Sequence, residues 1–216
     1  MNHLVIGNKN YSSWSLRPWI LLKEKGIEFK ETKIPLYLQN SREQILKYSP
    51  AAKVPVYFYK ETPVWDSLAI CETIAEIYPE KHCWPQSFDM RAIARSVSFE
   101  MHSGFHNIRE TLPMNCRTKM KFAPIKSELQ AEIDRICDIW KTCRKQNPNA
   151  GEFLFGEFSI ADAMYAPIVI RFDRYGIDVG AVEKQYIKSI LSLESMQQWI
   201  DEAISEREII EQAELG

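Results

Sequence analysis

The sequence predicts a small α/β domain followed by an all-helical domain. Strand-like and helix-like segments alternate over the first 81 residues, and beyond residue 88 the apolar residues recur only at helical spacing. A hydrophobic content of 45% over 216 residues supplies a core for one large domain or two small ones. We therefore expect domains over residues 1–81 and 89–216, joined by a linker over 82–88.

The first half of the α/β domain begins with an apolar strand, Leu4–Ile6. A helix from Ser15 to Lys25 follows, and Gly26 ends it. The segment Ile27–Ile34 is a weaker strand, so the first three elements form a strand-helix-strand unit with parallel pairing. Ser41 and Gln44 fit a Ser-x-x-Gln capping box, which predicts a short helix that ends at Ser49-Pro50.

The second half of the domain adds two strands and a helix. The strand-like run Val54–Tyr59 and the short return strand Val64–Trp65 are joined by a tight turn at Lys60–Pro63. Such a turn requires antiparallel pairing, so the predicted sheet is mixed. Asp66-Ser67 begins the next helix, which Pro79 closes.

Beyond the linker, helical spacing predicts five helices. The third is marked by a capping box, in which Asp162 takes the position of the usual Glu. The predicted helices cover Asp89–Leu112, a long segment from Pro124, a segment from Ser159, Val182–Leu191 and Ser195–Ile204.

Charge, hydropathy and cysteine content exclude several classes of protein. The net charge of −2 gives no reason to expect a nucleic-acid surface. No apolar run approaches the ~18 residues of a membrane span, and Met1-Asn2-His3 lacks the start of a signal peptide. Five cysteines without a Cys-x-x-Cys motif indicate free thiols. We therefore expect a cytoplasmic protein.

Serines cluster at the first strand-to-helix turn. A helix N-terminus needs a hydroxyl as its cap, and Ser15 is the favoured candidate for that local role. The hydroxyls of Ser12 and Ser13 are then surplus. They lie where helix N–H groups and the positive end of the helix dipole converge, which favours an anion such as a thiolate.

Two further positions could bind the other parts of a small peptide. Asp66 or Ser67 caps the last helix of the α/β domain, where the helix N-terminus favours a carboxylate and Asp66 favours an ammonium group. Val54 precedes Pro55, so its backbone groups could pair with an extended peptide. From the residues alone, an ordinary trans bond before Pro55 is favoured, since only ~5% of such bonds are cis.

In these features the sequence resembles the cytosolic glutathione transferases, and most closely their zeta class. The run Ser12–Arg17 resembles the zeta Ser-Ser-Cys-x-x-Arg motif, with Trp14 in place of the cysteine. Val54-Pro55 resembles the cis-proline turn of the family, and Asp66–Ile70 resembles the acidic-Ser motif that holds the γ-glutamyl end of glutathione. The resemblance extends to Ser159 and Asp162, to Pro167 and to the run from Arg174 to Asp178.

The resemblance implies a thioredoxin-like first domain of order βαβαββα, glutathione as co-substrate without a metal, and a homodimer. Ser12 would donate a hydrogen bond to the sulfur, with Ser13 or Tyr11 as alternative donors. Catalysis is thus assigned to Ser12 and Ser13, and glutathione binding to Ser12, Ser13, Lys53, Val54, Pro55, Asp66 and Ser67.

The electrophile is expected between the two domains, where sites commonly form. The first long helix offers Met101, His102, Phe105 and Arg109 as a wall for this cleft, and helical phase leaves open whether they face the cleft or the core. Arg174 matches the zeta arginine that meets a substrate carboxylate, and a surface ion pair with Asp173 or Asp178 is the alternative. The predicted substrate-binding residues are Met101, His102, Phe105, Arg109 and Arg174.

The predicted function is therefore activation of the glutathione thiol for conjugation to a small electrophile, as in detoxification, or for glutathione-assisted isomerisation. A non-catalytic binding or scaffolding protein of the same fold is the alternative. A thiol-disulfide reductase is disfavoured because the Ser12–Ser15 turn holds no cysteine. Ser103 stands where a zinc protease would need Glu between His102 and His106. Cys71 is expected to be a buried thiol, and the charge run from Asp201 to Glu208 a solvated helix face.

Overall fold

The computed structural model describes residues 2–117, 119, 125–146 and 151–214. Its sheet is mixed, with strand order β2-β1-β3-β4. The parallel pair β1–β2 and the antiparallel hairpin β3–β4 agree with the predicted topology, and the structure adds an antiparallel pair, β1–β3, that the sequence did not predict. The strands are β1 (Asn2–Ile6), β2 (Phe29–Lys33), β3 (Val56–Tyr59) and β4 (Thr62–Trp65), and the helices of this domain are α1 (Ser13–Glu24), α2 (Ser41–Leu46) and α3 (Ser67–Ile77).

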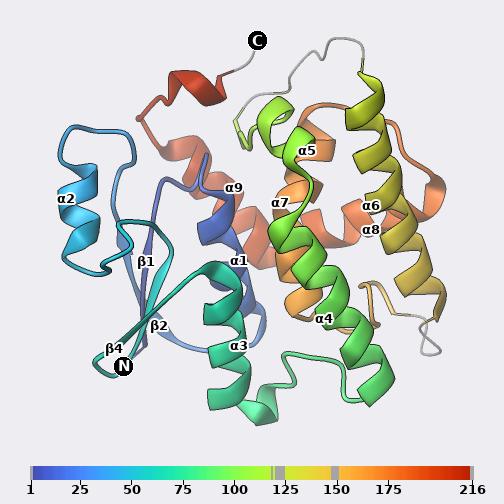
Figure 1. Ribbon diagram of the computed structural model, residues 1–216, viewed down its shortest axis with the longest axis horizontal. Coiled ribbons are helices and arrows are strands. Elements are labelled where there is room, and N and C mark those ends of the chain that lie inside the picture. The colour runs from blue at the N-terminus through green and yellow to red at the C-terminus, as the bar shows by residue number, and fades with distance from the viewer. Residues whose placement is uncertain (1, 118, 120–124, 147–150, 215–216) are drawn as a thin grey trace.

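The alternation of side chains along β1 divides the core of this domain between the two faces of the sheet. Leu4 and Ile6 belong to the large core that includes α1 and α3, whereas Val5 belongs to a small cluster with Ile34 and Ile45 on the α2 side. In Figure 1, α2 accordingly lies on the opposite side of the sheet from α1 and α3. Because successive side chains of β1 point to opposite faces of the sheet, this one strand packs against helices on both sides.

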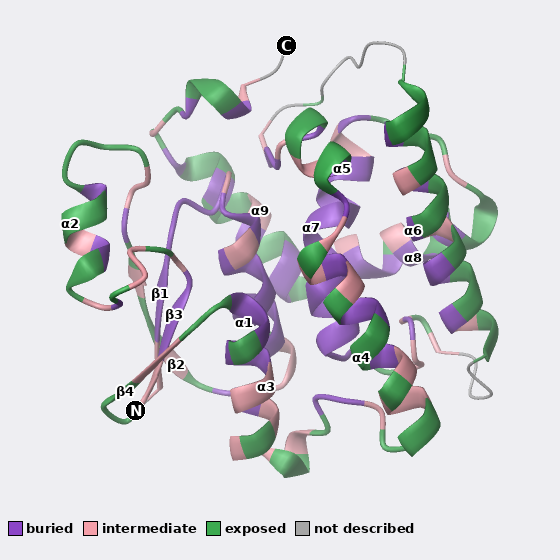
Figure 2. Ribbon diagram, in the orientation of Figure 1, coloured by how far each residue is buried: buried purple, intermediate pink, exposed green. Residues whose placement is uncertain are grey.

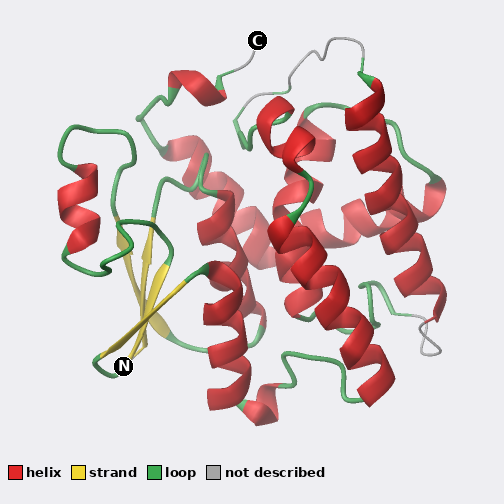
Figure 3. Cartoon of the chain, in the orientation of Figure 1, coloured by secondary structure: helices red, strands yellow, loops and turns green. Residues whose placement is uncertain are grey.

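The second domain consists of helices among the described residues (Figure 3). Its central helix, α7, is buried along nearly its whole length (Figure 2) and packs against α1 and α4. One continuous hydrophobic core therefore crosses the boundary between the domains. The helices are α4 (Phe88–Ser103), α5 (His106–Thr111), α6 (Ser127–Gln146), α7 (Ile160–Arg174), α8 (Ala181–Leu191) and α9 (Glu194–Ser205), with short 3₁₀ turns at Pro79–Lys81 and Glu211–Ala213.

Two boundaries of the second domain bear on the predictions. The Ser159–Asp162 capping box is present at the start of α7, as predicted. Pro124, the predicted start of the second long helix, lies outside the described residues. No helix in the described part of the chain is both long and apolar enough to cross a bilayer.

One predicted helix and one predicted cap were wrong, although the short helix that begins at Ser41 is present. The single helix over Asp89–Leu112 is broken, because Gly104 is extended and Phe105 has a left-handed φ of 59°. Apolar spacing did not reveal this break because α4 and α5 pack into the same core. Ser41 does not cap α2. Its hydroxyl donates to Pro35 O (2.6 Å) and accepts from Leu38 N (2.8 Å), so it holds the preceding loop while Asn40 takes the cap position.

Candidate active site

A pocket of about 900 Å³ opens on the first domain at the N-termini of α1 and α3. Its volume is in the range of small-ligand sites. Five of the predicted glutathione-binding residues line it, whereas Ser12 and Ser13 are not on the lining and are each only 6% exposed. The lining comprises Trp14, Leu36, Tyr37, Leu38, Ser41, Arg42, Ile45, Ala51, Ala52, Lys53, Val54, Pro55, Trp65, Asp66 and Ser67.

The Val54-Pro55 peptide bond on the pocket wall is cis, as the resemblance implied and as the residues alone did not. Val56 is the first residue of β3 that pairs with a neighbouring strand, so Val54 lies just outside the ladder. Val54 lines the pocket, and its backbone groups are not used by the sheet, as pairing with an extended peptide requires.

Asp66 and Ser67 lie beside Pro55 on the pocket wall, because Val56 and Trp65 are paired in the β3–β4 hairpin. Asp66 is the N-cap of α3, and its carboxylate accepts from the backbone N–H groups of Leu68 (2.9 Å) and Ala69 (3.4 Å), as the predicted cap requires. Its φ of 75° is unusual for a residue with a side chain, and such strain is concentrated at functional sites. The hydroxyl of Ser67 is buried and has no hydrogen-bond partner among the described residues.

Trp14 connects the pocket to the second domain. Its ring lies 4.2 Å from the guanidinium carbon of Arg17 and 4.7 Å from that of Arg109. His102 of α4 meets the same ring edge-on, at a centroid distance of 5.4 Å, and its Nε2 lies 3.2 Å from Asp66 Oδ2. The residue that replaces the zeta cysteine thus joins both domains, a contact that sequence reasoning missed because no local pattern signals it.

The charge balance beside Trp14 is unusual. Arg17 is fully buried, and none of its three guanidinium nitrogens has a hydrogen-bond partner in the described chain. Burial, together with Arg109 and Arg171, lowers its pKa well below the usual value. Arg109 is better matched, since it donates to Gly104 O (3.0 Å) and to the Met101 and His102 carbonyls at the end of α4. Two guanidinium groups, those of Arg17 and Arg109, therefore flank the Trp14 ring.

The serine turn differs from the prediction in its hydrogen bonding. Helix α1 begins at Ser13 with Ser12 as its N-cap residue, and no side chain makes the cap bond. Ser15 was predicted to be the cap, and this was wrong. Its hydroxyl instead accepts from Gly7 N (3.1 Å) and lies 2.7 Å from Ser12 Oγ. The turn therefore holds an internal pair of hydroxyls beside the end of β1.

Tyr11, the alternative donor to the sulfur, is directed away from this pair. Its hydroxyl donates to the Glu214 carboxylate and lies 3.5 Å from Glu208 O. Burial and the bond to Glu214 raise the pKa of Tyr11, which makes it a weaker proton donor. The structure therefore places Tyr11 against the C-terminal segment.

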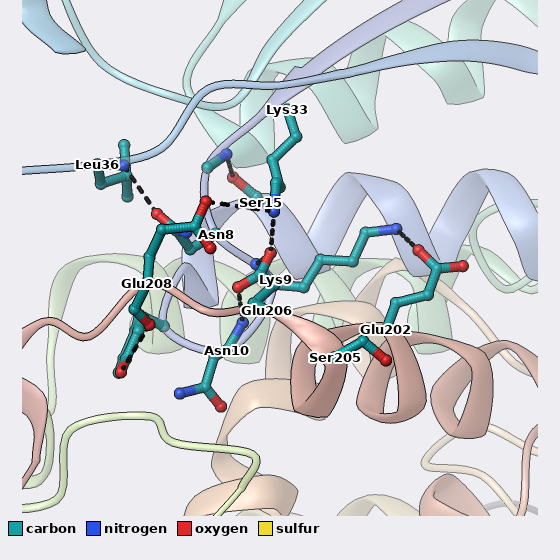
Figure 4. Close-up of polar contacts among 12 residues, drawn as sticks. Asn8, Lys9, Asn10, Ser15, Lys33, Leu36, Glu202, Ser205, Glu206 and Glu208 are labelled. Carbon is teal, nitrogen blue, oxygen red and sulfur yellow. Dashed lines mark hydrogen bonds and ion pairs between the residues drawn. The ribbon is translucent and has the colours of Figure 1, made fainter. Parts of the chain in front are cut away.

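That segment also holds the β1–α1 loop (Figure 4). The Glu206 carboxylate accepts from Lys9 N (2.8 Å) and Asn10 N (3.2 Å), and it pairs with Lys33 (3.1 Å). The buried Lys9 ammonium pairs with Glu31 (2.9 Å) and Glu202. The prediction that the whole charge run is a solvated face was thus wrong at Glu206, which is buried. Sequence reasoning missed this network because its partners are almost 200 positions apart.

The predicted substrate-binding residues lie in different environments, some in the core and others at the interface between the domains. Met101, on α4, and Phe105, in the break between α4 and α5, are buried in the common core, so they do not form a wall of the cleft. His102 and Arg109 lie at the domain interface beside Trp14. Arg174, at the end of α7, lies 3.7 Å from Asp173, the alternative foreseen for it, and its role toward a substrate stays a prediction.

Two other chemical features were considered in the sequence. All five cysteines are free, and burial raises the pKa of the Cys71 thiol, as expected of a core residue. Within the described ranges no group of three or more His, Cys, Asp or Glu side chains could hold a metal ion.

The fold and the pocket together define a class of protein. A thioredoxin-like domain carries a pocket lined by a cis-proline and by a helix N-terminus, and an all-helical domain packs against this first domain. Two family models match the chain, the glutathione S-transferase N-terminal domain over residues 11–77 and the glutathione S-transferase C-terminal domain over 123–202. Together they cover more than half of the chain, which therefore belongs to the glutathione S-transferase family.

Individual relatives agree with this assignment. The maleylacetoacetate isomerase of Rattus norvegicus is 28% identical over 193 residues, which cover 86% of this chain and 87% of the relative. A probable maleylacetoacetate isomerase of Caenorhabditis elegans is 26% identical over 173 residues, 78% of each chain. A glutathione transferase homologue from Burkholderia, solved with bound glutathione, has the same fold with a TM-score of 0.71 and 21% identity, covering 94% of this chain and 97% of its own.

Proposed function

We propose that the protein is a glutathione transferase that binds glutathione in the pocket beside Trp14 and activates its thiol. The activated thiol is then conjugated to a small electrophile or assists its isomerisation. The cis Val54-Pro55 bond and the adjacent N-terminus of α3 form a site for an extended tripeptide with a charged end. The family membership and the structure solved with glutathione support this assignment.

The observation that carries the proposal is the unpaired hydroxyl of Ser67. A buried hydroxyl without a partner is costly in a native protein, and this one lines a pocket at a helix N-terminus. The γ-glutamyl carboxylate of glutathione supplies the missing acceptor, and Asp66 faces the adjacent ammonium group. The same end of the pocket thus complements both charges of one ligand.

Thiol activation is assigned to Ser12 at the N-terminus of α1. A hydrogen bond to a charged group contributes ~1.5–3 kcal/mol, which lowers the pKa of the thiol by about one to two. The helix dipole and the unpaired Arg17 charge favour the thiolate in the same direction. Ser12→Ala is expected to reduce kcat/KM by at least about tenfold near neutral pH, and by less at high pH.

The electrophile approaches from the side of the second domain, at the Trp14–His102 boundary. The curated relatives named as maleylacetoacetate isomerases favour a carboxylate-bearing electrophile, and Arg174 is the proposed partner of that carboxylate. Conjugation and isomerisation depend differently on the zeta cysteine, which is Trp14 here. Its replacement bears on isomerisation, whereas conjugation requires only the thiolate of glutathione. Assays of conjugation to an aryl halide and of isomerisation of maleylacetoacetate distinguish them.

The test of glutathione binding uses Ser67→Ala with Ser98→Ala as its matched control. Ser98 is also buried, but its hydroxyl donates to Ala94 O (2.7 Å) within α4. Calorimetry is expected to show about ten- to a hundredfold weaker glutathione binding for S67A and unchanged binding for S98A. Equal affinity of S67A and the wild type contradicts the proposed site. Binding without turnover of any electrophile would instead define a non-catalytic scaffold.

We further propose a homodimer in the cytoplasm with a role in detoxification, as the family resemblance implies. Five free thiols suit a reducing compartment. Light scattering at micromolar concentration is expected to give twice the 25.2 kDa mass of one chain. A mass of one chain would exclude the dimer.

A further inference from the structure

The hydroxyl of Ser15 has two partners, and both bear on the proposed donor, Ser12. Ser15 is fully buried in the first turn of α1. Its oxygen accepts from the backbone N–H of Gly7 (3.1 Å), and it lies 2.7 Å from Ser12 Oγ. Serine is usually explained in a first turn by helix capping, but here the hydroxyl makes no cap bond. The buried pair therefore needs another explanation.

The hydrogen-bonding capacity of the two hydroxyls suggests one. A hydroxyl donates a single proton and has two acceptor lone pairs. In the structure Ser12 Oγ donates to Ser15 Oγ over 2.7 Å, and rotation of the two hydroxyls reverses the direction of this bond. If Ser12 donates to Ser15, no proton of Ser12 remains for a ligand. If Ser15 donates to Ser12, the Ser12 proton is free for an anion at the N-terminus of α1.

A bound thiolate selects the second arrangement, since it is the stronger acceptor. The hydrogen bonds then run from Gly7 N–H to Ser15, from Ser15 to Ser12, and from Ser12 to the sulfur. Each bond in such a chain polarises the next. Its first donor is fixed, because Gly7 directly follows β1 and is closely packed: a Cβ there would lie 2.6 Å from the Leu36 side chain.

We propose that Ser15 is a positioning residue for thiol activation, which orients the Ser12 hydroxyl toward the glutathione sulfur and strengthens its hydrogen bond. The proposal rests on the proposed function, because it requires a thiolate at Ser12. It assigns the serines of the turn distinct tasks: Ser12 contacts the sulfur, and Ser15 acts only through Ser12.

The test measures the pKa of enzyme-bound glutathione from the ultraviolet absorbance of its thiolate as a function of pH. Four variants are compared with the wild type: S12A, S15A, the double variant S12A/S15A, and S98A as the matched loss of another buried hydroxyl. Loss of the polarising bond in S15A is expected to raise the pKa of the bound thiol by about 0.3 to 0.7, a two- to fivefold lower thiolate fraction below that pKa. S98A should match the wild type.

The double variant separates positioning from a general structural role. If Ser15 acts through Ser12, S15A changes nothing further once Ser12 is alanine, so S12A and S12A/S15A have the same thiol pKa. A further rise in the double variant, or an S15A thiol pKa equal to that of the wild type, overturns the proposal. S15C, which keeps the side-chain volume with a weaker donor, gives the same comparison with a smaller rise if S15A does not fold.

Failure of this inference is distinguishable from failure of the proposed function. A wild-type protein that leaves the pKa of glutathione unchanged, or that does not bind it in calorimetry, contradicts the proposed function and with it the role of Ser15. A wild-type protein that lowers the thiol pKa, with S15A indistinguishable from it, contradicts the role of Ser15 alone.

Discussion

Glu206 is expected to be the residue on which the position of the β1–α1 loop depends most. The substitution Glu206→Ala removes the acceptor of two backbone N–H groups, those of Lys9 and Asn10. Both of these residues are buried, so water does not replace the lost acceptor. Hydrogen bonds to a charged group contribute ~1.5–3 kcal/mol each, and we expect a loss of about 3–5 kcal/mol in the free energy of unfolding.

The assay is thermal and urea-induced unfolding, with kcat/KM measured on the same preparations. For a chain of this length, a loss of about 3–5 kcal/mol lowers Tm by about 6–20 °C. Because the loop leads directly into Ser12, a displaced loop is also expected to reduce kcat/KM by about tenfold or more. Glu206→Gln, which keeps an uncharged acceptor, should lose roughly half as much stability.

Glu208→Ala is the matched control for this prediction. Its carboxylate is partly exposed and lies 3.8 Å from Lys33, so its removal should change stability by ~0–1 kcal/mol. The contacts that Glu208 makes to Tyr11 and Arg117 use its backbone carbonyl, and the substitution leaves them in place. If E206A unfolds at the same temperature as E208A, the reasoning about the loop is refuted.

Three more outcomes follow from the charges at the domain interface. Arg17→Met removes a buried guanidinium without a hydrogen-bond partner among the described residues, so urea unfolding should show a neutral effect or a gain of up to ~4 kcal/mol; a clear loss would mean that the contact with the Trp14 ring compensates the buried charge. Burial, together with Arg17 and Arg109, lowers the pKa of His102 below 6.5 despite the opposing effect of Asp66. The unfolded chain therefore binds the proton first, and the free energy of unfolding should fall as pH drops below about 6.5. The fall should be shallower in His102→Gln, and coinciding pH profiles of the two proteins would contradict this role of His102. Arg174→Ala should raise KM about fivefold or more for carboxylate-bearing electrophiles and leave neutral aryl halides unchanged; equal losses on both would show that Arg174 has a structural role.

The sequence by itself determined the features that depend on neighbouring residues. The apolar run Leu4–Ile6, the order of strands and helices and the tight turn at Lys60–Pro63 predicted the mixed sheet, because these signals depend on short segments of the sequence. The N-cap at Asp66 and the capping box of α7 were predicted because a cap bond spans only two or three residues. Most of the fold follows from such short-range rules, whereas the assignment of the glutathione site depended on the family resemblance.

Only the tertiary structure decided which way these elements face and what touches them. Helical phase placed Met101 and His102 on adjacent positions of one helix, but the packing of α4 on α7 turned one into the core and the other toward Trp14. Ser15 carried a valid capping signal, yet the close approach of Gly7 and Ser12 gave its hydroxyl other partners. Glu206 reached the β1–α1 loop from the far end of the chain. Local propensity acts over one turn of helix or one strand pair, whereas these contacts are fixed by the shape of a core that joins segments distant in the sequence.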